Sequence, residues 1–328
     1  MASPPSPPSP PSLPSPPPQR ESPSASSPSS LPALRYLLLR AQVGYGAEAQ
    51  TILHSPPEAR QPGRAVIICF AGLSGTKKDL VRHKRCARLF AHGYGLVLCD
   101  HYNAGERRVK SAGPSNQDGW ARCQRCHFWP ALHRGALGVP LVVSFAISAF
   151  GTSRVAAYGA SMGGDVLLSS LVFERRLCAL VCDRAAPDWL RPGSQGNALE
   201  CRCADDAADA SGARERLRRA SDELYAQCPQ RQLASFHAHP TALLFLCGEE
   251  DVHVPRQLSE RFVDELRRSG AYAAVESGAE GDGLGSGGHV DRLRVVALPS
   301  GGWLGHVFQS PAEVTEHVLH FFDHWATD

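Results

Sequence analysis

Three short segments of the chain carry the residue types of nucleophilic catalysis. The first is Gly159-Ala160-Ser161-Met162-Gly163, which follows the apolar run 154–158 and precedes a helical pattern over 165–172. Strand, Gly-x-Ser-x-Gly and helix in this order are typical of a nucleophile elbow, where the serine hydroxyl stands clear of the sheet. Small residues two positions before and after the serine are needed because the chain doubles back there. The motif also occurs in ordinary turns, so the interpretation requires an acid, a histidine and oxyanion donors elsewhere.

The other two segments supply an acid and a base after Ser161. The apolar run 242–248 leads into Asp251, and the apolar run 293–298 leads into His306. Serine, aspartate and histidine therefore occur in the order that the strand–elbow–helix architecture requires. In this interpretation Ser161 attacks a carbonyl carbon, His306 takes and returns the proton, and Asp251 orients the imidazole.

Alternatives remain for both partners of the serine. Asp183 also follows an apolar run and is the main rival of Asp251, whereas Glu249 and Glu250 fit solvated positions. His289, at the end of a Gly-rich loop of about 277–288, and His253, which we interpret as a surface residue, are the alternative bases.

A tetrahedral oxyanion needs two N–H donors, and the sequence places one candidate after each of two strands. Met162 directly follows the nucleophile, and Leu73 follows the apolar run 65–70. His101 and Tyr102 come directly after the apolar run 95–99, so we expect them to line the substrate pocket. Trp303 we interpret as a packing residue.

The elements that must position these residues alternate between strands and helices. Continuous apolar runs predict strands buried on both faces at 65–70, 95–99, 154–158, 179–182, 242–248 and 293–298. Helical patterns lie between them, and segments 33–43 and 47–54 predict an antiparallel start to the sheet. The expected class is α/β, a doubly wound and mostly parallel sheet that binds ligands beyond the carboxyl ends of its strands.

The chain resembles the α/β-hydrolase superfamily, in particular its dienelactone-hydrolase and prolyl-oligopeptidase-like serine esterases. The residues that carry the resemblance are Gly159-Ala160-Ser161-Met162-Gly163-Gly164, Gly248-Glu249-Glu250-Asp251-Val252-His253-Val254-Pro255 and Gly305-His306, within about 34–326; Gly105-Glu106-Arg107 with Phe128-Trp129 is similar to a small bacterial esterase branch. Related enzymes commonly begin the first oxyanion loop with His-Gly, where this chain has Ala71-Gly72.

The resemblance implies hydrolysis of an ester, thioester or amide through an acyl-enzyme, without a cofactor or metal. A carboxylesterase acting on a small-molecule ester is our first interpretation. A serine peptidase or aminopeptidase that takes short peptides is the second, and would need a carboxylate such as Glu249 or Asp188 to hold the α-amino group. A non-catalytic binding protein of the same fold is the third, because fold does not imply function.

Two regions differ from the rest of the chain in composition. Residues 1–31 are rich in Ser and Pro and predict a disordered tail ahead of a hydrolase domain over 32–328. The tail is an inert segment, a ligand for proline-binding domains, or a transit peptide. A charged helix is expected over 204–227, inside a cap insertion of about 188–240 that would shape specificity.

Charge and cysteine usage restrict the partners and the compartment. The net charge of +2 excludes a general nucleic-acid binder, and the longest apolar stretch, 139–150, predicts a core helix rather than a membrane span. The odd count of 11 cysteines and the lack of a secretory signal favour the cytoplasm, or a plastid or other organelle if the tail is a transit peptide. Basic residues over 77–88 are interpreted as the solvated face of a helix, with a docking patch for acidic groups as the alternative.

Cysteines also form one motif that could bind a cofactor. Cys123-Gln124-Arg125-Cys126-His127 matches the attachment signature of c-type haem, and Cys201 with Cys203 could complete a zinc clip with the same two thiols. No export signal accompanies the motif, and it lies where a loop enters a helix of the hydrolase pattern. We therefore predict neither haem nor metal.

Overall fold

The protein is described from a computed structural model. The structure describes residues 38–43, 50–108, 115–191, 210–270, 291–302 and 305–327. These all belong to the larger of two compact units, Leu31–Asp328, and the other unit is Met1–Ser30. Several sequence predictions lie outside the described residues: the Ser/Pro tail, residues 192–209 of the cap insertion, the Gly-rich loop, and His289, Trp303, Cys201 and Cys203.

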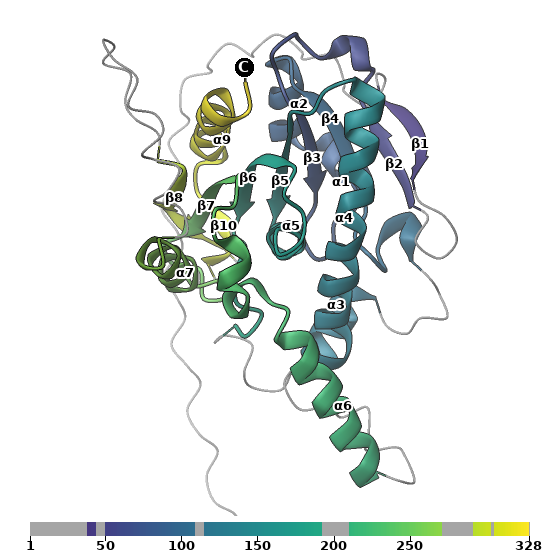
Figure 1. Ribbon diagram of the computed structural model, residues 1–328, viewed down its shortest axis with the longest axis vertical. Helices are drawn as coiled ribbons and strands as arrows, with labels where there is room; N and C mark the ends of the chain where they lie inside the picture. Colours follow the sequence, from purple (N-terminus) through teal and green to yellow (C-terminus); the bar gives the residue numbers. More distant parts are fainter. Residues whose placement is uncertain are drawn as a thin grey trace, which may run out of the picture. The chain divides into compact units, whose positions relative to one another are not determined.

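One eight-stranded sheet forms the centre of the fold (Figure 1). Its strands are β1 (Leu39–Val43), β2 (Gln50–His54), β3 (Val66–Phe70), β4 (Gly95–Cys99), β5 (Val155–Ala160), β6 (Leu177–Asp183), β7 (Ala242–Gly248) and β8 (Leu293–Leu298). Their order across the sheet is β1-β2-β4-β3-β5-β6-β7-β8. The first three pair antiparallel and all later neighbours pair parallel, so the predicted mostly parallel sheet with an antiparallel start is confirmed.

Helices connect the strands and cover the sheet. They are α1 (Lys77–Arg82), α2 (Lys84–Ala91), α3 (Asn116–Arg122), α4 (Trp129–Phe150), α5 (Met162–Ser170), α6 (Ala210–Tyr225), α7 (Arg256–Arg268) and α9 (Pro311–Trp325). Short 3-10 turns span Pro57–Ala59, Gly105–Arg107, Pro229–Arg231 and Leu233–Phe236, a π-helical turn spans Gln124–Phe128, and a small hairpin is made by β9 (Ser300–Gly301) and β10 (Val307–Phe308).

The two faces of the sheet carry two separate hydrophobic cores. Successive residues of a strand point to opposite faces. Val66 and Ile68 of β3 therefore pack with α4, α5 and α7, whereas Ile67 and Cys69 pack with α1, α2 and α9. Every residue of β3, β4 and β7 is buried, which explains why these strands appear in the sequence as continuous apolar runs. The fold is thus the predicted doubly wound α/β architecture.

Helix α4 is the predicted core helix. By length and composition, Gln124–Phe150 is the one helix among the described residues that could cross a membrane, but half of its most apolar window is buried inside the fold. Val139, Val142 and Val143 are fully buried in the same core as β3. Burial against the sheet accounts for the apolar side chains of this face, whereas Leu137 and Leu141 are exposed.

The interpretation of residues 77–88 as one solvated helix face was wrong in two respects. The chain turns at His83 and forms two helices, α1 and α2, instead of one. Lys77 is buried with its Nζ 2.5 Å from Asp100, and Arg85 is buried in an ion pair with Asp183. Asp100 and Asp183 lie at the carboxyl ends of apolar strands. The helical periodicity of residues 77–88 cannot reveal that two of its basic side chains pair with these buried acids.

Candidate active site

The turn between β5 and α5 has the geometry of a nucleophile elbow. Ser161 has φ 49° and ψ −120°, a backbone conformation that L-residues adopt only when the surroundings enforce it. A side chain on Gly159 would collide with the backbone of Gly163 and Gly164. One on Gly163 would collide with the carbonyls of Phe70 and Ala71 in the neighbouring loop. Steric crowding thus requires glycine on both sides of the serine.

Ser161, His306 and Asp251 lie in one hydrogen-bonded line. The Oγ of Ser161 lies 3.1 Å from Nε2 of His306, and Nδ1 of His306 lies 2.6 Å from Oδ2 of Asp251. The arrangement fits an imidazole that donates from Nδ1 to the carboxylate and accepts the serine hydroxyl at Nε2. The Asp251 side chain is fully buried and that of His306 is 16% exposed.

The acid is held by its own loop. Oδ1 of Asp251 accepts the backbone N–H groups of His253 and Val254, both at 2.9 Å. These bonds fix the carboxylate so that Oδ2 faces His306. Gly305, with φ 75°, lets the histidine loop approach the acid loop, since a side chain there would overlap the carbonyl of Glu250.

The alternative acid, Asp183, is used differently. It lies fully buried between Arg85, Arg184 and Tyr158, all of which donate to its carboxylate. Burial disfavours the charged carboxylate, but Arg184 and Arg85 outweigh this effect and hold the pKa of Asp183 far below its usual range. Asp183 therefore anchors two guanidinium groups, and His306 hydrogen-bonds Asp251 instead.

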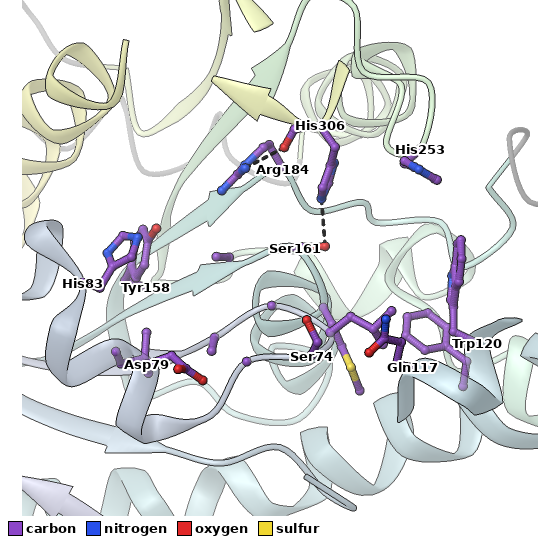
Figure 2. A pocket seen from close by; sticks show the side chains of 18 of the residues that line it. Ser74, Asp79, His83, Gln117, Trp120, Tyr158, Ser161, Arg184, His253 and His306 are labelled. Carbon is purple, nitrogen blue, oxygen red and sulfur yellow. Dashed lines mark hydrogen bonds between the residues drawn. The ribbon is translucent and has the colours of Figure 1, made fainter. Parts of the chain in front are cut away.

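A cavity of about 510 Å³ opens over Ser161. Its lining consists of Ala71, Gly72, Leu73, Ser74, Gly75, Asp79, Leu80, His83, Gln117, Trp120, Phe128, Tyr158, Ala160, Ser161, Met162, Arg184, Arg191, His253 and His306. Figure 2 shows the Ser161–His306 contact between two ends of this cavity, with His83 and Tyr158 at one end and Gln117 and Trp120 at the other. The cavity can therefore receive groups on both sides of a carbonyl that lies at Ser161.

Both predicted oxyanion donors border this cavity. Met162 is the first residue of α5, so its N–H is among those at a helix start that have no partner within the helix. Leu73 lies on the loop after β3, and both residues line the cavity beside Ser161. Both residues therefore lie at the cavity, and their role as oxyanion donors stays a prediction.

The expectation that His101 and Tyr102 line the pocket was wrong. His101 is fully buried, and its Nε2 lies 2.5 Å from the carbonyl oxygen of Ala71, beneath the oxyanion loop. Burial lowers the pKa of His101 to about 4, so the ring is neutral and donates to Ala71. The Tyr102 hydroxyl accepts a hydrogen bond from Arg134. A strand end near the site does not determine whether the next side chain faces the cavity or lies below it.

His253, by contrast, belongs to the site and is not the surface residue we expected. Its ring is buried and lies 5.8 Å from the ring of His306 and 5.7 Å from that of Trp120. Burial, together with His306 and Arg191, lowers the pKa of His253. It lines the cavity as a neutral aromatic ring.

Several lining residues had no signal in the sequence. Trp120 and Gln117 come from the short helix α3, and Arg184 and Arg191 come from the segment after β6. Of the predicted cap insertion, Arg191 is the one described residue that lines the cavity. Helix α6 instead stacks Tyr225 on Trp129, at the start of α4. A side chain that reaches a site from a distant segment leaves no pattern in the spacing of residues.

The Cys-x-x-Cys-His motif has a local structural role. Sγ of Cys123 accepts the backbone N–H of Cys126 at 3.3 Å and thereby caps the π-helical turn Gln124–Phe128. Among the described residues, no group of three or more His, Cys, Asp or Glu side chains could hold a metal ion.

One protein family matches a part of the chain that includes two residues of the hydrogen-bonded line. Residues 142–280 match the prolyl oligopeptidase family, a span that contains Ser161 and Asp251. A search of curated protein sequences found no match.

Similar solved structures include both esterases and peptidases. The crystal structure of TT1662 from Thermus thermophilus has a TM-score of 0.58 at 17% identity, over 88% of this chain and 98% of that one. The Pyrococcus furiosus esterase Pf2001 has a TM-score of 0.56 at 14% identity, over 93% and 97%. Pyrococcus horikoshii acylaminoacyl peptidase has a TM-score of 0.56 at 12% identity, over 89% of this chain and 42% of that one.

These neighbours establish the fold, and the family match supports a hydrolase of the serine type. The sequence predicted both this fold and a serine hydrolase, from the elbow, the Gly248–Pro255 segment and Gly305-His306. Residues 142–280 are thus similar to the prolyl oligopeptidase family, and the described domain shares its fold with these esterases and peptidases.

Proposed function

We propose that this chain is a carboxylesterase that works through an acyl-enzyme on Ser161. The observation that carries the proposal is the unbroken line of hydrogen bonds from Ser161 through His306 to Asp251. Each member contributes what acyl transfer needs: a hydroxyl, an imidazole and a buried carboxylate.

In the first half of the reaction, Oγ of Ser161 attacks the ester carbonyl while Nε2 of His306 takes its proton. The imidazolium that forms is stabilised by Asp251, which needs no proton of its own. The carbonyl oxygen becomes an oxyanion and accepts hydrogen bonds from the N–H groups of Leu73 and Met162. The tetrahedral intermediate then collapses, and His306 returns the proton to the departing alcohol.

In the second half, water takes the place of the alcohol. Nε2 of His306 removes a proton from the water as its oxygen attacks the acyl carbon. The same two N–H groups hold the second oxyanion. When that intermediate collapses, the acid leaves and His306 gives the proton back to Oγ of Ser161.

The charges around the cavity favour an ester over a peptide with a free amino terminus. Asp79 is the one carboxylate among the lining residues, and it already accepts from the N–H and hydroxyl of Thr76 at the start of α1. Two guanidinium groups, those of Arg184 and Arg191, also line the cavity, each paired with a buried aspartate (Asp183 and Asp165), so neither offers a site for a protonated amine. Neither of the acids considered from the sequence lines it, and Asp188 is bound by Tyr225 and Arg261.

A serine peptidase is the second candidate, and two observations favour it. Residues 142–280 match the prolyl oligopeptidase family, and an acylaminoacyl peptidase is among the structural neighbours. A peptide whose amino terminus is blocked carries no protonated amine and needs no carboxylate. The charges that line the cavity are therefore compatible with such a peptide.

A substrate panel separates the candidates. We expect purified protein to hydrolyse p-nitrophenyl esters of short and long acids, and to leave p-nitroanilides of free amino acids intact. Ser161→Ala should remove the ester activity, while Ser144→Ala, on the outer face of α4, should keep it. Faster turnover of N-acylated nitroanilides than of esters would favour the peptidase. A folded wild type that turns over neither class would favour a binding protein.

A further inference from the structure

The strongest unassigned feature near the site is a charged cluster at the end of β6. Asp183 is fully buried there between the guanidinium groups of Arg85 and Arg184. The Arg184 side chain is 19% exposed and continues from this cluster to the cavity wall. The cluster therefore connects the buried carboxyl end of β6 with the active site.

Arg184 joins the cluster to the histidine loop. Its Nε donates to Oδ1 of Asp183 at 2.7 Å. Its Nη1 donates to the backbone carbonyl oxygen of His306 at 2.6 Å (Figure 2). The guanidinium also lies 4.9 Å from the centre of the Phe308 ring, on β10. The guanidinium of Arg184 thus contacts this loop at His306 and again at Phe308.

The backbone of Arg184 is fixed in an unusual conformation. Its φ is 54°, which few residues other than glycine adopt, and its N–H donates to the carbonyl oxygen of Leu246 at 2.8 Å. Positive φ at a residue with a long side chain persists where the surroundings hold it. Here the backbone is tied to β7 while the side chain reaches across to His306.

We propose that Arg184 is a positioning residue that sets the place of His306 through its backbone carbonyl. This inference rests on the proposed function. Asp251 and Ser161 hydrogen-bond the ring of His306, but neither of them holds the main chain of its loop. Arg184 supplies a second, independent restraint on the main chain. Asp183 fixes the guanidinium of Arg184. The end of β6 therefore supports the base, His306, whereas the acid, Asp251, comes from the loop after β7.

The side chain of Arg184 also lines the cavity, so direct contact with substrate is the competing explanation. The two roles predict different kinetics. Loss of a positioning residue lowers kcat by the same factor for every ester, because His306 acts on all of them. Loss of a substrate contact raises KM and does so unequally for different acyl or alcohol groups.

The test uses Arg184→Gly in the full chain, with Arg184→Lys beside it. Glycine accepts positive φ without strain, so Arg184→Gly removes the side chain and leaves a comfortable backbone. Lysine keeps the charge but cannot bridge Asp183 and His306 with a planar fork. Arg176→Ala is the matched control, because it also strips a guanidinium from a buried acid, Glu174, far from the cavity.

We expect Arg184→Gly to lower kcat on short and long p-nitrophenyl esters about 10- to 100-fold, with little change in KM. Labelling by a fluorophosphonate should slow by a similar factor, and Arg184→Lys should recover only part of the loss. Arg176→Ala should keep wild-type kcat. A kcat of Arg184→Gly equal to that of Arg176→Ala, or a rise in KM alone, would overturn the inference. An inactive wild type would contradict the proposed function itself, and with it the inference.

Discussion

The imidazole of His101 lies beneath the oxyanion loop, with its Nε2 2.5 Å from the carbonyl oxygen of Ala71. Related enzymes commonly start this loop with a histidine, and here Ala71 stands in that place. A histidine from the end of the neighbouring strand β4 holds the loop from below instead. The contact explains how the loop before Leu73 is anchored despite its unusual first residue.

The burial of His101 predicts a stability that falls as the solution becomes acidic. Burial lowers its pKa to about 4, and the same cause lowers the pKa of His239 to about 4. An unfolded chain takes up these protons below about pH 6.5, whereas the folded chain does not until about pH 4. Stability contributed by each neutral ring is therefore present above about pH 6.5 and is lost as the pH falls towards 4.

Urea unfolding of wild type and His101→Gln at about pH 7.5 and about pH 5 measures this effect. Glutamine keeps an N–H donor but does not titrate. For each histidine the full loss is on the order of 3 kcal/mol, so the wild type should weaken more than the variant between the two pH values. Equal losses would show that His101 is not held neutral by the fold.

The sequence predicted every strand of the sheet, most clearly those in which burial on both faces leaves continuous apolar runs such as 65–70 and 242–248. The three residues of the hydrogen-bonded line, Ser161, Asp251 and His306, were predictable because each lies at the end of, or in the loop after, one of these strands. His101 shows the limit of this reasoning. A residue after a strand can point into the cavity or below it, and only the packed structure decides.

Buried charge was the other feature that sequence patterns could not reveal. Lys77 and Arg85 look like members of a solvated basic face, and their partners Asp100 and Asp183 are distant in sequence. Arg184 follows β6 in the chain, but nothing in the spacing shows that its side chain reaches His306. Which charged side chains pair at the carboxyl ends of the strands depends on how helices and strands pack, and the spacing of residues in the sequence does not contain this information.

Replacement of each candidate acid distinguishes their roles. Asp251→Asn keeps an oxygen for the N–H groups of His253 and Val254 but removes the charge that faces His306. We expect kcat to fall about 10³- to 10⁴-fold with little change in melting temperature. Asp183→Asn should instead destabilise the fold, by about 3–5 kcal/mol, because two guanidinium groups lose their buried partner. At a temperature where both are folded, a lower kcat for Asp183→Asn than for Asp251→Asn would reverse the assignment.

Gly305 provides a steric test of the loop that carries His306. A methyl group there would overlap the carbonyl of Glu250, next to Asp251, and would drive the two loops apart. Gly305→Ala should therefore lower kcat at least about 100-fold. Gly151→Ala is the control, because Gly151 has a similar positive φ of 59° but no atom within 4 Å of the added methyl. Comparable activities of the two variants would show that close approach of the loops is not needed.

Lys77 and its neighbour Lys78 test the buried ion pair. Lys77 is 1% exposed and lies 2.5 Å from Asp100 and 3.2 Å from Glu106, whereas Lys78 faces solvent. Lys77→Ala leaves a buried carboxylate unpaired and should reduce the free energy of unfolding by about 3–5 kcal/mol. Lys78→Ala should change it by less than about 0.5 kcal/mol. Equal denaturation midpoints would mean that the Lys77–Asp100 pair is solvated.

The central claim, that Ser161 is a nucleophile activated by His306, is tested most directly by covalent labelling. Intact protein is treated with a fluorophosphonate, and the modified peptide is identified by mass spectrometry. We expect stoichiometric modification of Ser161 in the wild type, slow modification in His306→Ala, and none in Ser161→Ala. Wild-type protein that is folded but unlabelled, or labelled at another serine at the same rate in Ser161→Ala, would contradict the account.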